Sequence, residues 1–209
     1  MRRFLLAVVL PPIALLAQTQ TIEVSLERNQ AGVWKSIDPG LVLDQGDLLR
    51  FRFRTSFEGY LYVINSGTSG TQSLLFPGEG TGRNNRVQAG KEYFVPSTDA
   101  SFRVAGPAGH DVIYWLVSPV PLESSPAAML GRPETRPKSK LIPRCDDSIF
   151  RARGLCIDSS AGPRNIGDQE LPNMTKRELQ IVQDKDKSRV SSPAGLSGPV
   201  IYEFRVAHR

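Results

Sequence analysis

Apolar and polar residues alternate in short runs through the first 118 residues. Residues 21–28 place Ile22, Val24 and Leu26 on one face, with polar side chains between them. This period of two is typical of a half-buried β-strand. Further runs follow at residues 49–54, 60–64, 72–76, 93–95, 102–104 and 112–117. Turn residues separate them about every 8–12 positions, so the sequence predicts an all-β fold, an antiparallel β-sandwich over residues 18–118, either immunoglobulin-like or an open barrel.

Two of these runs predict more than a strand. In residues 49–54 the apolar side chains alternate with Arg50, Arg52 and Arg54, which places three guanidinium groups on one face. Residues 60–64 are apolar on both faces, as in a strand covered on two sides. The aromatic residues of the apolar strands are expected in the core, with a ligand groove as the alternative; they are Tyr60, Tyr62, Tyr114 and Trp115.

The composition changes at Pro119. Six prolines occur between residues 119 and 143, which predicts a linker without regular structure. Residues 144–209 are expected to form a mostly irregular extension. Within it, the spacing of Thr175 and Glu178 matches a capping box and predicts one short helix near residues 175–186. Residues 200–207 alternate as clearly as the first strand, and a strand this apolar is expected to pair with the main sheet.

The first 17 residues have the features of a secretory signal peptide. Arg2 and Arg3 precede an apolar run that Pro11 and Pro12 interrupt, and Ala17 is a small residue suited to cleavage. An uncleaved anchor is the alternative. We expect an exported protein, periplasmic or secreted, without stable membrane insertion once the signal is removed.

Two cysteines, Cys145 and Cys156, have ten residues between them. In an exported chain this spacing favours one disulfide bond. A metal site would need further ligands, and the only histidines, His110 and His208, are distant in the sequence. We therefore expect neither a metal nor another cofactor.

The formal net charge of +5 does not indicate nucleic-acid binding. Residues 18–122 contain 9 basic and 10 acidic side chains, so the excess lies in the first 17 residues and in the tail, where 15 basic residues stand against 11 acidic ones. The tail has no basic stripe interleaved with aromatic residues, the pattern that nucleic acids require. A protein or polymer of the envelope is the expected partner.

Between Asp47 and Ser118 the chain resembles a bacterial family of exported or envelope-associated modules, domain of unknown function 4384. Five stretches carry the resemblance in the family's order: GDLLRFRF, GYLYVIN, SLLFP, NNRVQAGKEYFVP and FRVAGPAGHDVIYWLVS. The family has no agreed active site, so the resemblance implies no role for any residue here.

The sequence favours binding over catalysis. The row of Arg50, Arg52 and Arg54 is the candidate binding surface, because planar guanidinium groups recognise carboxylates and phosphates, although such rows are also common on the solvated face of a sheet. No catalytic residue is assigned. The alternatives are a hydrolase outside the cytosol, with His110 as its base, and a structural subunit of a secretion or surface assembly.

Overall fold

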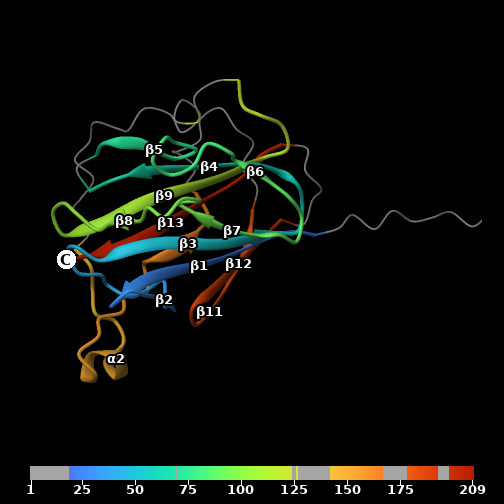
Figure 1. The fold of residues 1–209 in the computed structure, drawn as a ribbon. Helices are drawn as coiled ribbons and strands as arrows, with labels where there is room; N and C mark the ends of the chain where they lie inside the picture. Colours follow the sequence, from blue (N-terminus) through green and yellow to red (C-terminus); the bar gives the residue numbers. More distant parts are fainter. Residues whose placement is uncertain (1–18, 69, 124–125, 127–141, 167–177, 193–197) are drawn as a thin grey trace, which may run out of the picture.

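The computed structural model describes residues 19–68, 70–123, 126, 142–166, 178–192 and 198–209, and it is a sandwich of two sheets (Figure 1). The first sheet has the strand order β11-β12-β1-β3-β7, with β2 beside β1 and β8 beside β3. The second has the order β10-β13-β9-β4-β5, with β6 beside β4. All neighbouring strands in these orders are antiparallel.

The strands of the first sheet are β1 (Gln20–Gln30), β2 (Val33–Ile37), β3 (Leu48–Thr55), β7 (Glu92–Val95), β8 (Phe102–Arg103), β11 (Gln180–Asp184) and β12 (Lys187–Ser192). Those of the second are β4 (Gly59–Ser66), β5 (Gln72–Phe76), β6 (Arg86–Val87), β9 (Gly109–Ser118), β10 (Gly162–Arg164) and β13 (Val200–His208).

Aromatic side chains from both sheets fill the core between them. Trp115 of β9 is fully buried, and its ring meets the edge of Phe51 of β3 at a centroid distance of 5.2 Å. Phe51 meets Phe204 of β13 in the same way at 5.3 Å. Edge-to-face pairs of this kind add to the stabilisation that burial of their apolar area already supplies.

The predicted fold class is confirmed, and so is the terminal strand. β13 lies between β10 and β9 and pairs with β9 over nine residues. However, the sandwich does not end at residue 118. Residues after 161 supply the outer neighbours of β1 and β9, because each of these apolar strands needs a hydrogen-bonded partner on both edges.

The prediction of a helix near residues 175–186 is wrong for the residues of this range that the structure describes. Residues 180–184 form β11, which pairs with β12. Leu179 is buried and Ile181 packs against the core, whereas Val182 is exposed, so the pattern here has a period of two. Sheet pairing overrides the local capping signal. Residues 175–177 lie outside the described part of the chain, as do the predicted signal peptide and most of the predicted linker.

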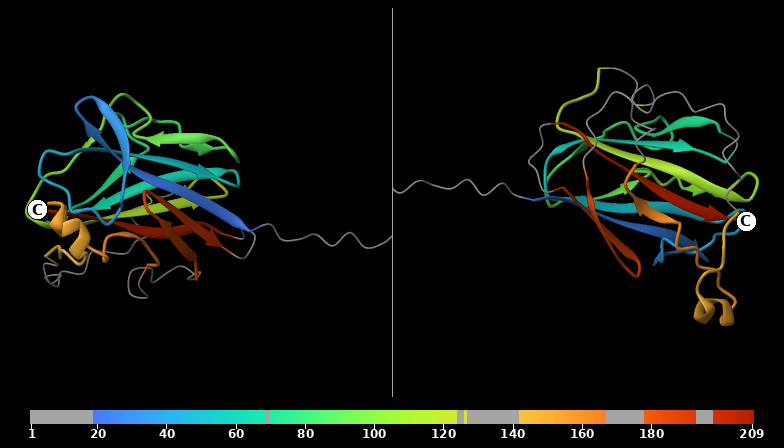
Figure 2. Two further views of the ribbon diagram at one scale, coloured as in Figure 1. Left: turned by 90° about the horizontal axis from the view of Figure 1, so that it is seen from below. Right: turned by 180° about the vertical axis from the view of Figure 1, so that it is seen from behind.

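The helix that does form is α2 (Ser148–Ala152). Asp147 caps its N-terminus, because its side chain accepts hydrogen bonds from the backbone N–H groups of Ile149 and Phe150. Figure 2 shows this helix at the end of a loop that projects from the sandwich. None of the helices in the described ranges is long and apolar enough to cross a bilayer.

The outer face of the second sheet is covered. Ile64 of β4 and Tyr114 of β9 are buried on this face together with Ile166, which follows β10. A second small cluster places Cys156 and Ala161 against Ala207 of β13. Side chains on either side of β10 therefore cover part of the outer face of this sheet.

Candidate functional site

The three predicted arginines lie on the outer face of the first sheet. The alternation of β3 turns Phe51 and Phe53 into the core and Arg50, Arg52 and Arg54 outward. In the register with β1, Arg50 lies opposite Glu27 and Arg54 lies opposite Glu23. Arginines and glutamates therefore meet directly across the two strands.

Glu23 is held between two guanidinium groups. Arg54 Nη2 donates to one of its carboxylate oxygens at 2.7 Å, and Arg189 Nη2 of β12 donates to the other at 2.8 Å. The hydrogen bonds from Arg54 and then Arg189 lower the pKa of Glu23, although partial burial opposes them. The hydrogen bond with Glu23 in turn raises the pKa of Arg54.

Glu27 is the centre of a second ion-pair group. Arg50 Nε donates to Glu27 Oε2 at 2.7 Å. Arg52 Nε approaches Glu27 Oε1 at 3.0 Å, as an ion pair rather than an aligned hydrogen bond. Arg52 Nη1 also lies 3.5 Å from Glu92 of β7. The carboxylate of Glu27 is buried beneath these groups, which compensates the cost of removing its charge from water.

Two aromatic rings enclose Arg50. Its guanidinium carbon lies 4.5 Å from the centroid of the Trp34 ring on β2 and 4.4 Å from that of Phe94 on β7. Such contacts are favourable cation–π interactions, and they fix the plane of the guanidinium group. Arg50 is therefore the most constrained of the three arginines.

The outer face of the first sheet is layered by charge. The side chains of Arg54 and Arg189 are 52% and 58% exposed, whereas those of Glu23 and Glu27 are 17% and 8% exposed. An approaching molecule therefore meets guanidinium groups before these carboxylates. Each guanidinium has five N–H donors, and the bond to Glu23 uses one nitrogen of Arg54 and one of Arg189. The remaining donors can bind an anion.

The sequence pointed to the row on β3 but not to its partners. Arg189 is separated from Glu23 by 166 positions, and Trp34 and Phe94 come from other strands. The alternation of charged residues in residues 21–28 was the one signal that could have identified Glu23 and Glu27 as the facing carboxylates.

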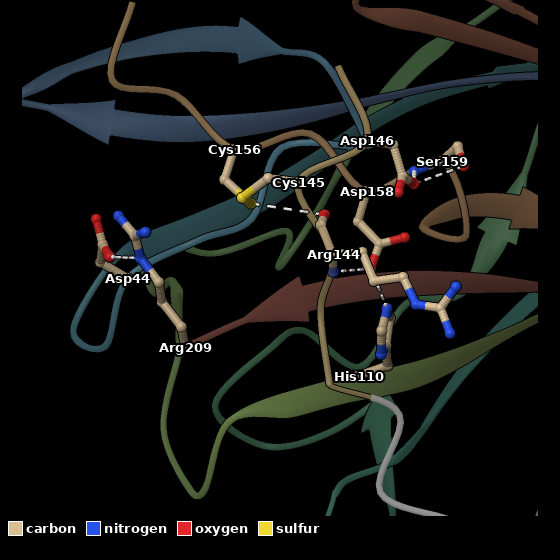
Figure 3. Close-up of a disulfide and its surroundings, with 9 residues drawn as sticks. All are labelled: Asp44, His110, Arg144, Cys145, Asp146, Cys156, Asp158, Ser159 and Arg209. Atoms are coloured by element: carbon tan, nitrogen blue, oxygen red, sulfur yellow. Dashed lines mark hydrogen bonds and ion pairs between the residues drawn. A yellow bond between two sulfur atoms is a disulfide. The ribbon is translucent and has the colours of Figure 1, made fainter. Parts of the chain in front are cut away.

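The predicted disulfide bond is present between Cys145 and Cys156 (Figure 3). Asp158 lies two residues beyond it and is buried. The Asp158 carboxylate accepts hydrogen bonds from the backbone N–H of Arg144 at 3.0 Å and from that of Ser160 at 2.8 Å. The bond with Arg144 joins the two segments that flank the disulfide loop to each other.

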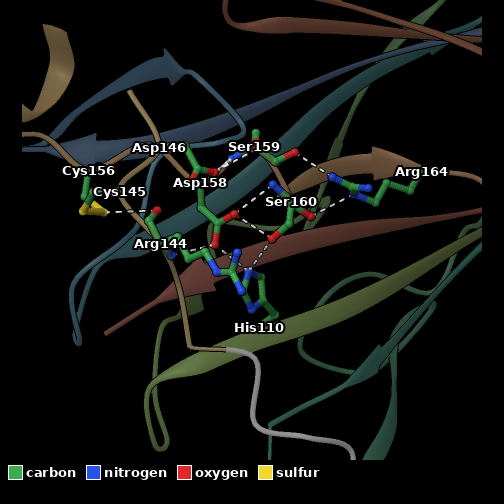
Figure 4. Close-up of polar contacts among 9 residues, drawn as sticks. All are labelled: His110, Arg144, Cys145, Asp146, Cys156, Asp158, Ser159, Ser160 and Arg164. Carbon is green, nitrogen blue, oxygen red and sulfur yellow. Dashed lines mark hydrogen bonds and ion pairs between the residues drawn. A yellow bond between two sulfur atoms is a disulfide. The ribbon is translucent and has the colours of Figure 1, made fainter. Parts of the chain in front are cut away.

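His110 contacts this same carboxylate. Its Nε2 lies 3.1 Å from Asp158 Oδ2 and 3.2 Å from Ser160 Oγ, while Ser160 Oγ donates to Asp158 Oδ1 at 2.6 Å (Figure 4). Burial raises the pKa of Asp158, but the hydrogen bonds from Ser160 and Arg144 and the charge of His110 outweigh it and lower that pKa.

This arrangement differs from a nucleophilic triad. In a triad, serine and aspartate contact opposite nitrogens of the imidazole, so that one nitrogen can accept the serine proton. Here both lie at Nε2. A nitrogen that donates to a carboxylate cannot accept the proton of Ser160, and the hydroxyl already donates to Asp158. The cluster joins β9 to the disulfide loop.

The other candidates from the sequence are placed as follows. Trp115 lies in the core between the sheets, as expected, whereas Tyr62 and Tyr114 are buried on the outer face of the second sheet and Tyr60 is half-buried. His208 is fully buried and lies 3.6 Å from Asp111. The part of the chain that the structure describes contains no group of three or more histidine, cysteine or acidic side chains arranged to hold a metal ion.

No curated protein and no solved structure matches the chain. The family model described as Domain of unknown function (DUF4384) matches residues 42–121, which extend from the residues before β3 to just beyond the end of β9. The resemblance of residues 47–118 is thereby confirmed, and this stretch of the sandwich is a domain of the DUF4384 family.

Proposed function

We propose that this chain is a non-enzymatic binding module of the bacterial cell envelope, periplasmic or secreted, which binds a polyanionic surface polymer on the outer face of its first sheet. The observation that carries the proposal is the layering of charge on this face. Exposed guanidinium groups of Arg54 and Arg189 lie over the largely covered carboxylate of Glu23.

The physical basis is the geometry of the donors. Alternate residues of a strand are about 6.6 Å apart, so the row on β3 presents cations at regular intervals along one line. A polymer with repeated carboxylates or phosphates can contact several of them at once, which raises its overall affinity. Pairing with Glu23 and Glu27 holds the guanidinium groups in place before a ligand binds, which lowers the entropy cost of binding.

The disulfide supports the proposed location. The chain has a disulfide between Cys145 and Cys156, and disulfides persist mainly in oxidising compartments such as the periplasm and the extracellular space. The contacts of His110 favour a role in packing over catalysis. β13 pairs with β9 of its own chain, which favours a separate module over a subunit that donates this strand to a neighbour.

The test compares two pairs of arginines. Binding of the purified chain to polygalacturonate is measured by calorimetry against neutral dextran, for the wild type and for Arg54→Ser with Arg189→Ser. The matched control is Arg83→Ser with Arg86→Ser, which removes the same charge from side chains that are 80% and 62% exposed elsewhere. We expect about a tenfold loss of affinity in the first pair, no loss in the control, and weakening by salt.

Three results would contradict the proposal. Binding of dextran as strong as that of polygalacturonate would exclude charge recognition. An equal loss in the control pair would show that only the total charge matters. Binding of poly-glutamate without binding of polygalacturonate would indicate an acidic protein as the partner. An unchanged melting temperature in both variants shows that the comparison reports on binding.

A further inference from the structure

A loop closed by the disulfide bond projects from the sandwich. It comprises residues 145–156, carries α2, and is called the finger below. Figures 1 and 2 show it extending from the sandwich, with α2 at its far end. Helices in globular proteins usually bury one face, but α2 buries none of its residues. The helix α2 therefore does not serve to pack against the sandwich.

The finger is held in one shape by several bonds. The disulfide closes its base, and Asp147 caps the helix through the N–H groups of Ile149 at 2.8 Å and Phe150 at 3.1 Å. At the other end the N–H of Leu155 donates to the carbonyl of Phe150 at 2.9 Å. Asp146 accepts two hydrogen bonds from Ser159, which join the base of the finger to the segment that leads into β10. A loop ordered in advance loses little entropy when it binds.

The end of the finger combines apolar and basic side chains. Ile149 is 63% exposed and Leu155 is 41% exposed, with the half-buried Phe150 between them in sequence. Arg151 and Arg153 are exposed beside them. Residues 148–155 contain no acidic side chain, and the two aspartates at the base are engaged by the contacts above. The exposed end therefore has a net charge of +2.

We propose that the finger docks on the surface of a lipid bilayer that contains anionic phospholipids. Ile149 and Leu155 would enter the boundary between headgroups and acyl chains, and Arg151 and Arg153 would bind lipid phosphates. This inference is independent of the polymer binding proposed above, because the finger shares no residue with the first sheet.

The small area of the finger favours a bilayer over a protein partner. A specific protein interface buries about 800 Å² on each side, and one helical turn that stands clear of the sandwich cannot supply this area alone. A bilayer has no such threshold, because each apolar or cationic group that reaches it adds to the binding free energy. The expected association is weak and reversible.

The experiment uses the oxidised full chain and two kinds of protein-free vesicle. Co-sedimentation is measured with phosphatidylcholine vesicles and with equal parts of phosphatidylcholine and phosphatidylglycerol. The apolar test is Ile149→Ser with Leu155→Ser. Its matched control is Val33→Ser with Val182→Ser, two side chains that are 58% and 63% exposed on the first sheet. The charge test is Arg151→Ser with Arg153→Ser, and its control is again Arg83→Ser with Arg86→Ser.

We expect the wild type to bind the anionic vesicles more tightly than the neutral ones. Either finger variant should lower the partition coefficient on anionic vesicles about tenfold or more, and both controls should leave it unchanged. Circular dichroism establishes that each variant is folded.

Three outcomes would overturn the proposal. Absence of binding to protein-free vesicles would indicate a protein as the partner of the finger. An equal loss in the control variants would show that the finger has no special part in docking. Loss of vesicle binding in Arg54→Ser with Arg189→Ser, but not in the finger variants, would assign the lipid surface to the first sheet; polymer binding by that sheet is measured separately.

Discussion

The two sheets share one core, but their outer faces differ in how far they are exposed to solvent. The first sheet leaves its outer face to solvent, with the guanidinium groups of Arg54 and Arg189 uppermost. The second buries Ile64 and Tyr114 on its outer face under Ile166. At one end of that covered face lies the cluster of His110 and Asp158.

We expect this difference to separate the residues that stabilise the fold from those of the proposed binding face. Buried apolar groups contribute free energy of folding in proportion to the area that they hide from water. Exposed ion pairs contribute little to folding, because water and salt screen them. Substitutions on the covered face should therefore change the unfolding free energy, and those on the open face should change binding.

Removal of residues 199–209 should have the largest effect. β13 is an inner strand of the second sheet, and its loss leaves β10 without a neighbour and β9 paired on one edge only, with β4, and exposes one side of the core. Because domains of this size are stable by only about 5–15 kcal/mol, we expect no cooperative thermal transition. Circular dichroism melting measures this. A trimmed protein that keeps the wild-type melting temperature would contradict the structure.

The next largest effect is expected when an aliphatic side chain on the covered face is truncated, and the same truncation on the open face is the comparison. Ile64→Ala should lower the unfolding free energy by about 2–4 kcal/mol, since Ile64 is fully buried and truncation leaves a cavity. Val182→Ala on the first sheet should cost less than about 0.5 kcal/mol, because this side chain is 63% exposed. Urea titration of both variants gives the two values. Equal losses would mean that the faces do not differ.

Loss of the disulfide should have an intermediate effect. Cys145→Ser with Cys156→Ser removes the constraint on a loop that spans 11 positions and contacts the covered face through Ala207. The chain-entropy relation gives a cost of about 3 kcal/mol, and native-state contacts that remain should keep the loss near 2–3 kcal/mol. Chemical denaturation of the variant tests this, with the reduced wild type as control. A reduced wild type as stable as the oxidised one would contradict it.

The smallest effect is a pH dependence at Asp158. Its folded pKa lies below the ordinary value of 3.8, so its stabilisation is complete above that pH and is lost as the pH falls through the folded pKa. Asp158→Asn should cost about 1–3 kcal/mol at pH 7 through its weakened hydrogen bonds. It should also flatten the fall in stability as the pH drops below about 4.

Urea titrations at several pH values measure this slope. Glu79→Gln is the control, because the Glu79 side chain is 91% exposed. The prediction fails if Asp158→Asn and the wild type lose stability in parallel as the pH falls.

The sequence by itself determined those features that depend on neighbouring residues. Alternation in residues 21–28, 49–54 and 200–207 fixed three strands and the face on which Arg50, Arg52 and Arg54 lie. Continuous apolar character in residues 60–64 indicated a strand covered on both sides, as β4 is. These properties are local because side chains on a strand alternate between two faces whatever the strand pairs with.

Only the tertiary structure decided which distant segments meet. Arg189 reaches Glu23 because β12 pairs with β1, and Asp158 reaches His110 because the segment after the disulfide loop returns to the second sheet, where β10 pairs with β13. The same long-range pairing made residues 180–184 a strand where the capping signal predicted a helix. The reason is energetic: local propensities differ by less than about 1 kcal/mol per residue, and burial and sheet hydrogen bonds outweigh them.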